Sequence, residues 1–166
     1  MENNVNNVSL QQYLNRIKTG EKVFENAFQS ISRMILNDEI SKVVVNGKTT
    51  YDFKIFRRGE KHMIGLYDEI NSFVSYVKDA AEGGSSKEMA YVLVGEPGNG
   101  KTFFVDMLCS KYREFLSLER NRKYTFRFNN LNQLGKYGKI DQVESQTYED
   151  PVILAMNLFG TLDQSK

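Results

Sequence analysis

The chain has 166 residues, with 22 Lys and Arg against 21 Asp and Glu, and this length fits one ordinary domain core rather than two large ones. The formal net charge of +1 gives no sign of a nucleic-acid surface, and no apolar run approaches the ~18 residues of a membrane helix. A single cysteine, and a start that lacks the pattern of a signal peptide, predict a soluble cytoplasmic protein.

The first part of the chain predicts two helices and a β-hairpin. Ser9 and Gln12 have the spacing of a capping box before a helix that Gly20 ends. Residues 21–37 carry a second apolar stripe, and we expect the two helices to form a helical hairpin. An Asn-Gly pair between the β-rich runs of residues 42–53 predicts a small β-hairpin.

The middle of the chain leads into a glycine-rich loop. Residues 56–62 are rich in charge and predict a surface connection, and residues 66–81 have the apolar spacing of a long helix that the Gly-Gly-Ser-Ser run at 83–86 ends. Residues 90–94 are continuously apolar, which is the pattern of a strand buried on both faces of a parallel sheet.

Helical spacing resumes after the loop for about four turns. Residues 124–128 alternate aromatic and polar side chains and predict a second strand. Pro151 precedes an apolar helix over residues 152–159, which we expect Gly160 to end.

The glycine-rich loop matches the phosphate-loop pattern GxxxxGK(S/T), also called Walker A, at every fixed position. An apolar run precedes it and an amphipathic helix follows it, which is the context that this motif requires. Glycines let backbone N–H groups turn toward phosphate oxygens, and the start of the helix adds its own free N–H groups. The predicted binding residues are Gly95, Glu96, Pro97, Gly98, Asn99, Gly100, Lys101 and Thr102.

Two side chains of the loop have distinct predicted roles. Lys101 is expected to reach the β- and γ-phosphates, and the Thr102 hydroxyl is expected to ligate Mg²⁺. The predicted cofactors are therefore ATP and Mg²⁺. Ile64 and Gly65, before a predicted helix, are candidates for adenine contact, since AAA+ ATPases place a backbone segment there; alternatively, Ile64 is a core residue and Gly65 only starts the helix.

A catalytic acid is not evident in the sequence. Phosphate loops that hydrolyse or transfer phosphate need an acidic residue at the end of another apolar strand, and no such strand follows Thr102. The available acids, Asp141, Glu144, Glu149 and Asp150, lie in polar surroundings. The sequence therefore predicts an α/β, AAA+-like P-loop NTPase with a three-layer core that is incomplete at its C-terminus, and it identifies no catalytic residue.

Several stretches in order resemble the N-terminal AAA+ domain of PrkA-type serine protein kinases, over residues 9–160. They are LQQYL (10–14), SRMI (32–35), YDF (51–53), IGL (64–66), DAAE (79–82), the phosphate loop, YTFRF (124–128) and YEDP (148–151). The Asn-rich composition of residues 1–8 predicts a flexible N-terminus, and we expect a helical and β-hairpin extension at 9–62 and a partial P-loop AAA+ nucleotide-binding domain at 63–166.

The resemblance also implies a function for a longer parent protein, an ATP-dependent serine/threonine protein kinase acting on a protein substrate. We expect the chain by itself to bind Mg-ATP with negligible turnover. Two alternatives stay open, an AAA+ ATPase that remodels protein or nucleic-acid partners and a non-catalytic regulatory module that binds ATP. Ring assembly is common among AAA+ modules, so a homo-oligomer is a further expectation, whereas a membrane partner is not.

Overall fold

The computed structural model describes residues 7–60, 62–135 and 138–163, with side chains as far as residue 159. Contacts divide the chain into two compact units: Met1–Phe24 with Leu118–Lys166, called the terminal unit, and Glu25–Ser117, called the central unit. Residues 1–6 of the predicted flexible N-terminus lie outside the described residues. The predicted division between residues 62 and 63 stays a prediction.

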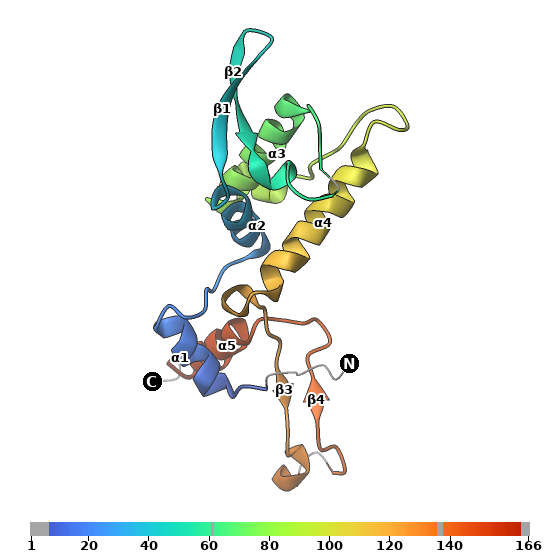
Figure 1. The fold of residues 1–166 in the computed structure, drawn as a ribbon. Coiled ribbons are helices and arrows are strands. Elements are labelled where there is room, and N and C mark those ends of the chain that lie inside the picture. Colours follow the sequence, from blue (N-terminus) through green and yellow to red (C-terminus); the bar gives the residue numbers. More distant parts are fainter. Residues whose placement is uncertain (1–6, 61, 136–137, 164–166) are drawn as a thin grey trace. The chain divides into compact units, whose positions relative to one another are not determined.

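Helices and short strands make up both units (Figure 1), which confirms a mixed α/β content. The terminal unit contains α1 (Leu10–Lys18), β3 (Arg127–Phe128), β4 (Val143–Glu144), α5 (Pro151–Asp163) and 3-10 helices at Glu119–Asn121 and Leu131–Leu134. The central unit contains α2 (Ala27–Leu36), β1 (Ile40–Val45), β2 (Lys48–Phe53), α3 (Tyr67–Ala81), α4 (Lys101–Ser117) and 3-10 helices at Lys54–Phe56 and Ser85–Glu88. Within this described part, none of the helices has both the length and the apolar character for crossing a membrane.

In the terminal unit, helix α1 begins with the predicted capping box. Ser9 Oγ accepts a hydrogen bond from the Gln12 N–H at 3.2 Å, and Gln12 Oε1 accepts one from the Ser9 N–H at 3.0 Å. Buried Tyr13 donates its hydroxyl to Asp150 at 3.2 Å, just before α5. Burial and then the negative charge of Asp150 raise the pKa of Tyr13, so the phenol stays protonated and keeps this link between the two helices.

The end of the chain differs from the sequence-based expectation in two ways. Only Arg127–Phe128 of the predicted strand 124–128 is a strand, and it pairs antiparallel with β4 so that Arg127 lies opposite Glu144. Helix α5 does not end at Gly160 but runs to Asp163. One glycine inside a helix costs only about 1 kcal/mol, too little to stop a helix that is otherwise apolar and well placed.

The predicted second helix starts later in the structure. Asn26 caps α2, with its Oδ1 accepting from the Gln29 N–H at 2.9 Å and its own N–H donating to Gln29 Oε1 at 3.0 Å. A second capping box therefore sets the start of this helix, and residues 21–26 precede it as an irregular segment. Because α1 and α2 belong to different compact units, the expected helical hairpin is not a unit of this structure.

The predicted β-hairpin is confirmed in the central unit. Strands β1 and β2 pair antiparallel from Ile40 opposite Phe53 to Val45 opposite Lys48. Asn46 and Gly47 connect them with φ of 51° and 76°, the left-handed conformation that a two-residue hairpin turn of this kind needs. Helix α3 packs against β2 and α2, so the hairpin is attached to the helical core of this unit.

Residues 56–62 are only partly the surface connection that their charges predict. Phe56 is 1% exposed and Met63 is 6% exposed, and both belong to the core cluster formed with the apolar faces of α2, α3 and α4. Arg58 and His62 are exposed, as predicted. The charges of this stretch gave no indication that the apolar residues at its two ends, Phe56 and Met63, are buried in the core.

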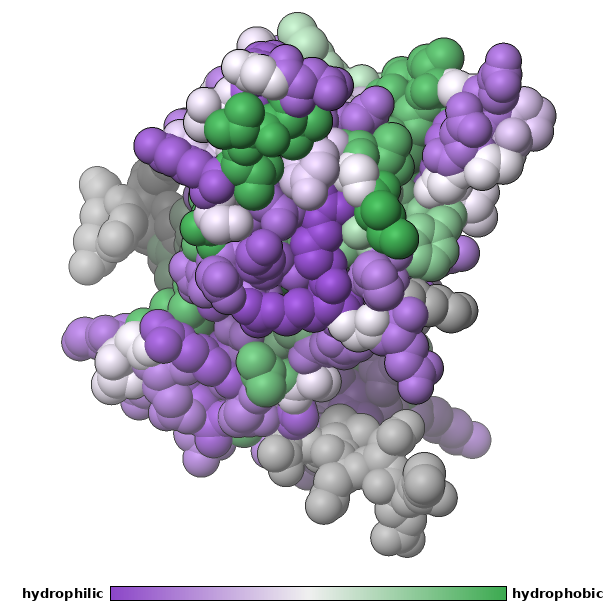
Figure 2. Space-filling model, turned by 45° about the horizontal axis from the view of Figure 1, so that its top comes forward, coloured by the Kyte–Doolittle hydropathy of each residue, from purple (hydrophilic) through white to green (hydrophobic). Residues whose placement is uncertain are grey.

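The prediction of a buried strand at residues 90–94 is wrong for this structure. The segment has no strand pairing, and Val92 and Val94 are 72% and 89% exposed. A strand forms only where a neighbour accepts its hydrogen bonds, and the described strands pair as two separate antiparallel pairs. Figure 2 shows one mainly hydrophilic face on which hydrophobic residues lie in separate patches. The three-layer core stays a prediction.

The Gly-Gly-Ser-Ser run after α3 is an ordered turn. Asp79 Oδ2 accepts a hydrogen bond from the Ser86 N–H at 2.9 Å, and hydrogen bonding from the Ser86 side chain and then from its backbone lowers the pKa of Asp79. A Cβ built on Gly84 would lie 2.1 Å from Asp79 Oδ1, so the carboxylate occupies the space that a side chain at 84 would need. Glycine at this position therefore preserves the turn that leads into residues 90–94.

We expect Gly84→Ala to lower the melting temperature by a few degrees, because the new methyl group displaces the Asp79 carboxylate from Ser86. Thermal melts of Gly84→Ala, Asp79→Ala and the double variant measure this. In the Asp79→Ala background the carboxylate that the methyl group would meet is absent, so Gly84→Ala should then have a smaller effect. An equal loss in both backgrounds would contradict the steric explanation.

Candidate functional site

The glycine-rich loop joins residues 90–94 to helix α4, which begins at Lys101 (Figure 1). Gly98 and Gly100 have φ of 87° and 74°, in the left-handed region that residues with a Cβ seldom adopt. The Phe104 N–H donates to the Gly100 carbonyl at 2.8 Å, which opens the helix directly after the second of these glycines. The loop therefore ends at a helix N-terminus, where N–H groups are available to an anion.

Lys101 folds back over the loop. Its ammonium Nζ donates to the Gly95 carbonyl at 2.8 Å and to the Glu96 carbonyl at 2.7 Å. The positive charge is thus held against the backbone of the loop by two neutral acceptors. A phosphate oxygen, which is charged, is a stronger acceptor for an ammonium than either carbonyl. Thr102, the predicted Mg²⁺ ligand, is exposed in the first turn of α4.

Both flanks of the loop are anchored on one aromatic side chain of α3, Phe73. The ring of Phe73 packs edge-on against Tyr91 before the loop, with centroids 5.4 Å apart, and against Phe104 after it, at 5.1 Å. Tyr91 also packs against Tyr76, whose hydroxyl donates to the Met89 carbonyl at 2.7 Å. The loop itself is exposed, but its two ends are attached to the same buried ring.

The predicted adenine segment lies in the same unit as the loop. Ile64 is 84% exposed, so the alternative that it is a core residue is wrong, and its neighbour Met63 is the core residue instead. Gly65 has φ of 68° and precedes Leu66, with φ of 53°, at the start of α3. Met63 and Phe104 are members of one core cluster, which connects this segment with the loop.

The sequence predicted that Arg57 and Arg58 form a solvated charge cluster, and for Arg57 this prediction is wrong. Its guanidinium donates to Asp52 Oδ1 at 2.7 Å and to the carbonyls of Met63 and Gly65 at 2.8 and 2.9 Å. Charge alone could not distinguish it from Arg58, which is exposed and pairs with Asp38 and Glu39. One signal was available: Arg57 directly follows Phe56, an apolar residue in an otherwise charged stretch.

Asp52 is a buried carboxylate that holds two cations. It is 5% exposed and accepts hydrogen bonds from Lys54 Nζ at 2.8 Å and from Arg57 Nε at 2.7 Å. Burial by itself raises the pKa of this carboxyl, but the two hydrogen bonds and the two positive charges outweigh burial, and the pKa of Asp52 is lowered. The group is therefore ionised near neutral pH, as its partners require.

The acids that the sequence offered as candidates all belong to the terminal unit. Glu144 pairs with Arg127 at 3.4 Å across the β3–β4 ladder. Asp150 accepts from Tyr13 and, through Oδ1, from the Val152 N–H at 2.8 Å, which caps α5. These two have structural roles, and among the described residues no cluster of three or more His, Cys, Asp or Glu side chains is arranged to hold a metal ion.

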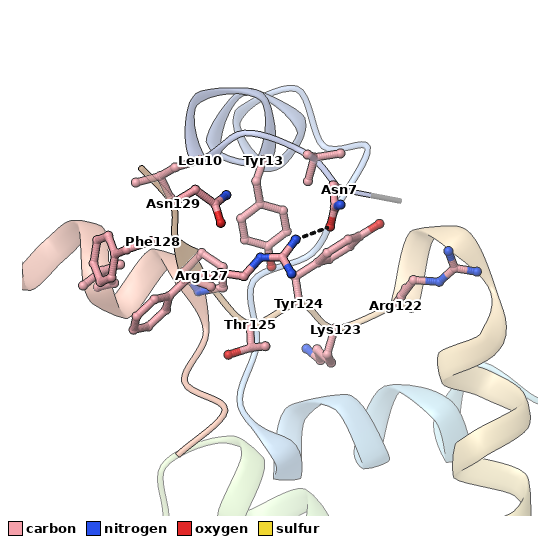
Figure 3. A pocket seen from close by; sticks show the side chains of 14 residues that line it. Asn7, Leu10, Tyr13, Arg122, Lys123, Tyr124, Thr125, Arg127, Phe128 and Asn129 are labelled. Atoms are coloured by element: carbon pink, nitrogen blue, oxygen red, sulfur yellow. Dashed lines mark hydrogen bonds between the residues drawn. The ribbon is translucent and has the colours of Figure 1, made fainter. Parts of the chain in front are cut away.

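The terminal unit contains a cavity of about 770 Å³ that none of the predicted site residues lines (Figure 3). Aromatic and basic side chains surround it, and Figure 3 shows Arg127 directed toward Asn7, with 3.5 Å between Nη2 and Oδ1. Arg127 also pairs with Glu144, and Arg122 pairs with Glu119 at 3.1 Å. Two of the basic side chains that line the cavity are thus already paired with carboxylates of the same unit.

The comparison with family models gave a match for this chain. A family model described as "PrkA AAA domain" matches residues 8–122, which is more than half of the chain and includes the loop and residues 63–65. Neither the comparison with curated proteins nor the comparison with solved structures gave a match.

We expect Phe73→Ala to lower the free energy of unfolding by about 3–5 kcal/mol, because it removes the ring on which Tyr91 and Phe104 pack. Phe103→Ala, which truncates an exposed aromatic residue next to Phe104, is the matched control and should cost about 1 kcal/mol or less. Urea unfolding of both variants measures this. Similar losses for the two would contradict the anchoring role of Phe73.

Acidification should reduce the stabilising contribution of Asp52. Because its pKa is lower in the folded state, the contribution is present above the unfolded pKa of about 3.9 and is lost as the pH falls through the folded pKa. Asp52→Asn should therefore be less stable than wild type by about 1–3 kcal/mol at pH 7, with a smaller difference at pH 3. Urea unfolding at both pH values tests this, with the exposed Asp106→Asn as control. A difference in unfolding free energy between wild type and Asp52→Asn that is the same at both pH values would contradict the lowered pKa of Asp52.

Proposed function

We propose that this chain, which belongs to the PrkA AAA domain family, binds ATP with Mg²⁺ at residues 95–102. Family membership indicates a nucleotide-binding AAA module. The observation that carries the finer proposal is the position of Lys101, whose ammonium lies against the carbonyls of a glycine turn at the start of a helix. A glycine turn, a helix N-terminus and one ammonium together form a receptor for a polyphosphate.

In this proposal, binding exchanges the partners of Lys101. The ammonium leaves the carbonyls of Gly95 and Glu96 and donates to oxygens of the β- and γ-phosphates. Backbone N–H groups of residues 96–100 surround the phosphates, and the Thr102 hydroxyl binds Mg²⁺. Ile64 and Gly65 contact the adenine ring, for which the exposure of Ile64 gives support.

For the whole protein we propose transfer of phosphate to a protein serine or threonine, as the resemblance of several stretches to PrkA-type serine protein kinases implies. A regulatory module that binds ATP without using it is the second candidate for this chain. The engagement of Glu144 and Asp150 in structural contacts of the terminal unit favours it, because neither then serves as a catalytic acid in the described arrangement.

We expect Lys101→Ala to weaken binding of Mg-ATP about 100-fold or more, because it removes an ammonium that bonds two phosphates, and to leave the fold intact. Lys111→Ala removes a lysine of the same helix that pairs with Glu114, and it is the matched control with unchanged binding. Isothermal titration calorimetry measures both. A well-folded wild type that gives neither heat nor a thermal shift at millimolar Mg-ATP would overturn the proposal.

A further inference from the structure

The two carbonyls that flank Ile64 are held by a single side chain. Arg57 Nη1 donates to the Met63 carbonyl at 2.8 Å and to the Gly65 carbonyl at 2.9 Å. The Met63 N–H donates in turn to the Phe56 carbonyl at 2.9 Å. Three hydrogen bonds therefore hold the backbone of residues 63–65 to Phe56 and Arg57, and the Ile64 side chain remains exposed to solvent.

Arg57 itself has little freedom to move. Its Nε donates to the buried Asp52 carboxylate, and its guanidinium carbon lies 4.5 Å from the centre of the Tyr67 ring. The buried Nη2 has no hydrogen-bond partner among the described residues, and the stacking on Tyr67 gives a physical reason why the arrangement is tolerated. A guanidinium can serve a carboxylate, two carbonyls and a ring at once, which an ammonium cannot.

The backbone that Arg57 holds is in an uncommon conformation. Gly65 and Leu66 have φ of 68° and 53°, so two successive residues are left-handed, and the second of them has a Cβ. Left-handed conformations of such residues are strained and persist where surrounding contacts impose them. The bond from Arg57 to the Gly65 carbonyl is such a contact. The two left-handed residues, Gly65 and Leu66, turn the chain between exposed Ile64 and the first residue of α3.

The same segment packs against helix α4, which follows the phosphate loop. Phe56, the residue before Arg57, lies with its ring centroid 5.8 Å from that of Phe104. The Phe104 N–H bonds the Gly100 carbonyl of the loop. A short path of contacts therefore runs from residues 63–65 through Phe56 and Phe104 to Gly100 of the loop. The packing of these two core rings thus sets the distance between residues 63–65 and the loop.

We propose that Arg57 is a positioning residue for the base of the bound nucleotide, holding residues 63–65 so that Ile64 presents an apolar surface to a purine ring while residues 95–102 hold the phosphates. This inference rests on the proposed function and adds a residue to it. Arg57 does not touch the nucleotide. It acts on affinity for the base through the backbone on either side of Ile64, and it leaves the grip on the phosphates unchanged.

The test compares a ligand that has a base with one that has none. Calorimetry with Mg-ATP and with magnesium tripolyphosphate is carried out on wild type, Arg57→Lys and Arg58→Lys. Arg57→Lys keeps the charge but cannot keep all three hydrogen bonds, so it should weaken ATP binding about tenfold and change tripolyphosphate binding less than about twofold. Arg58→Lys, the matched control on the neighbouring exposed arginine, should change neither.

Gly65→Ala provides a second variant that leaves Arg57 and Asp52 intact. A Cβ at residue 65 would meet no atom within 4 Å, but the left-handed φ becomes strained, so the segment shifts without a steric clash. The same loss confined to ATP is expected. If Arg57→Lys weakens the binding of ATP and of tripolyphosphate equally, or changes neither, the inference is overturned. In that case, binding of both ligands by the wild type still upholds the proposed function. A wild type that binds neither would overturn both.

Discussion

The contact between Phe73 and the two aromatic residues that flank the glycine loop is the constraint on which the central unit depends. Tyr91 precedes the loop and Phe104 follows it, and both pack within 5.4 Å of the Phe73 ring centroid. A loop of exposed glycines has high conformational entropy and little apolar surface of its own to bury. Its ends can be held in place only by such neighbours, and one buried ring fixes both of them.

An ionic network around the buried Asp52 carboxylate connects β2 with the segment before α3. Asp52 on β2 holds Lys54 and Arg57, and Arg57 holds the backbone on either side of Ile64. Buried charges are retained only when they are paired and hydrogen-bonded, and nearly all polar atoms of this network are. The β1–β2 hairpin therefore contributes to the site, because β2 supplies the Asp52 carboxylate that holds Arg57 beside the segment before α3.

The two parts of the proposed nucleotide site differ in how they are built. The phosphate-binding part uses main-chain geometry, with glycines at 98 and 100 and a helix start, and it depends on few side chains. The base-binding part is a side-chain construction in which a guanidinium imposes an uncommon backbone. Phosphate recognition of this kind is common to many proteins, so we expect the choice of base to be made at the second part.

The sequence by itself determined the features that depend on residues close together in the chain. The capping box at Ser9, the turn at Asn46 and Gly47, the apolar stripe of α3 and the phosphate-loop pattern each involve only a few neighbouring residues, so their local chemistry was sufficient. Tertiary structure alone decided that Phe56 is buried, that Arg57 and not Arg58 bonds the buried Asp52 carboxylate, and that residues 90–94 have no strand pairing. These outcomes depend on which distant groups supply an apolar surface, a carboxylate or a hydrogen-bonding strand, and hydropathy along the chain carries no information about such partners.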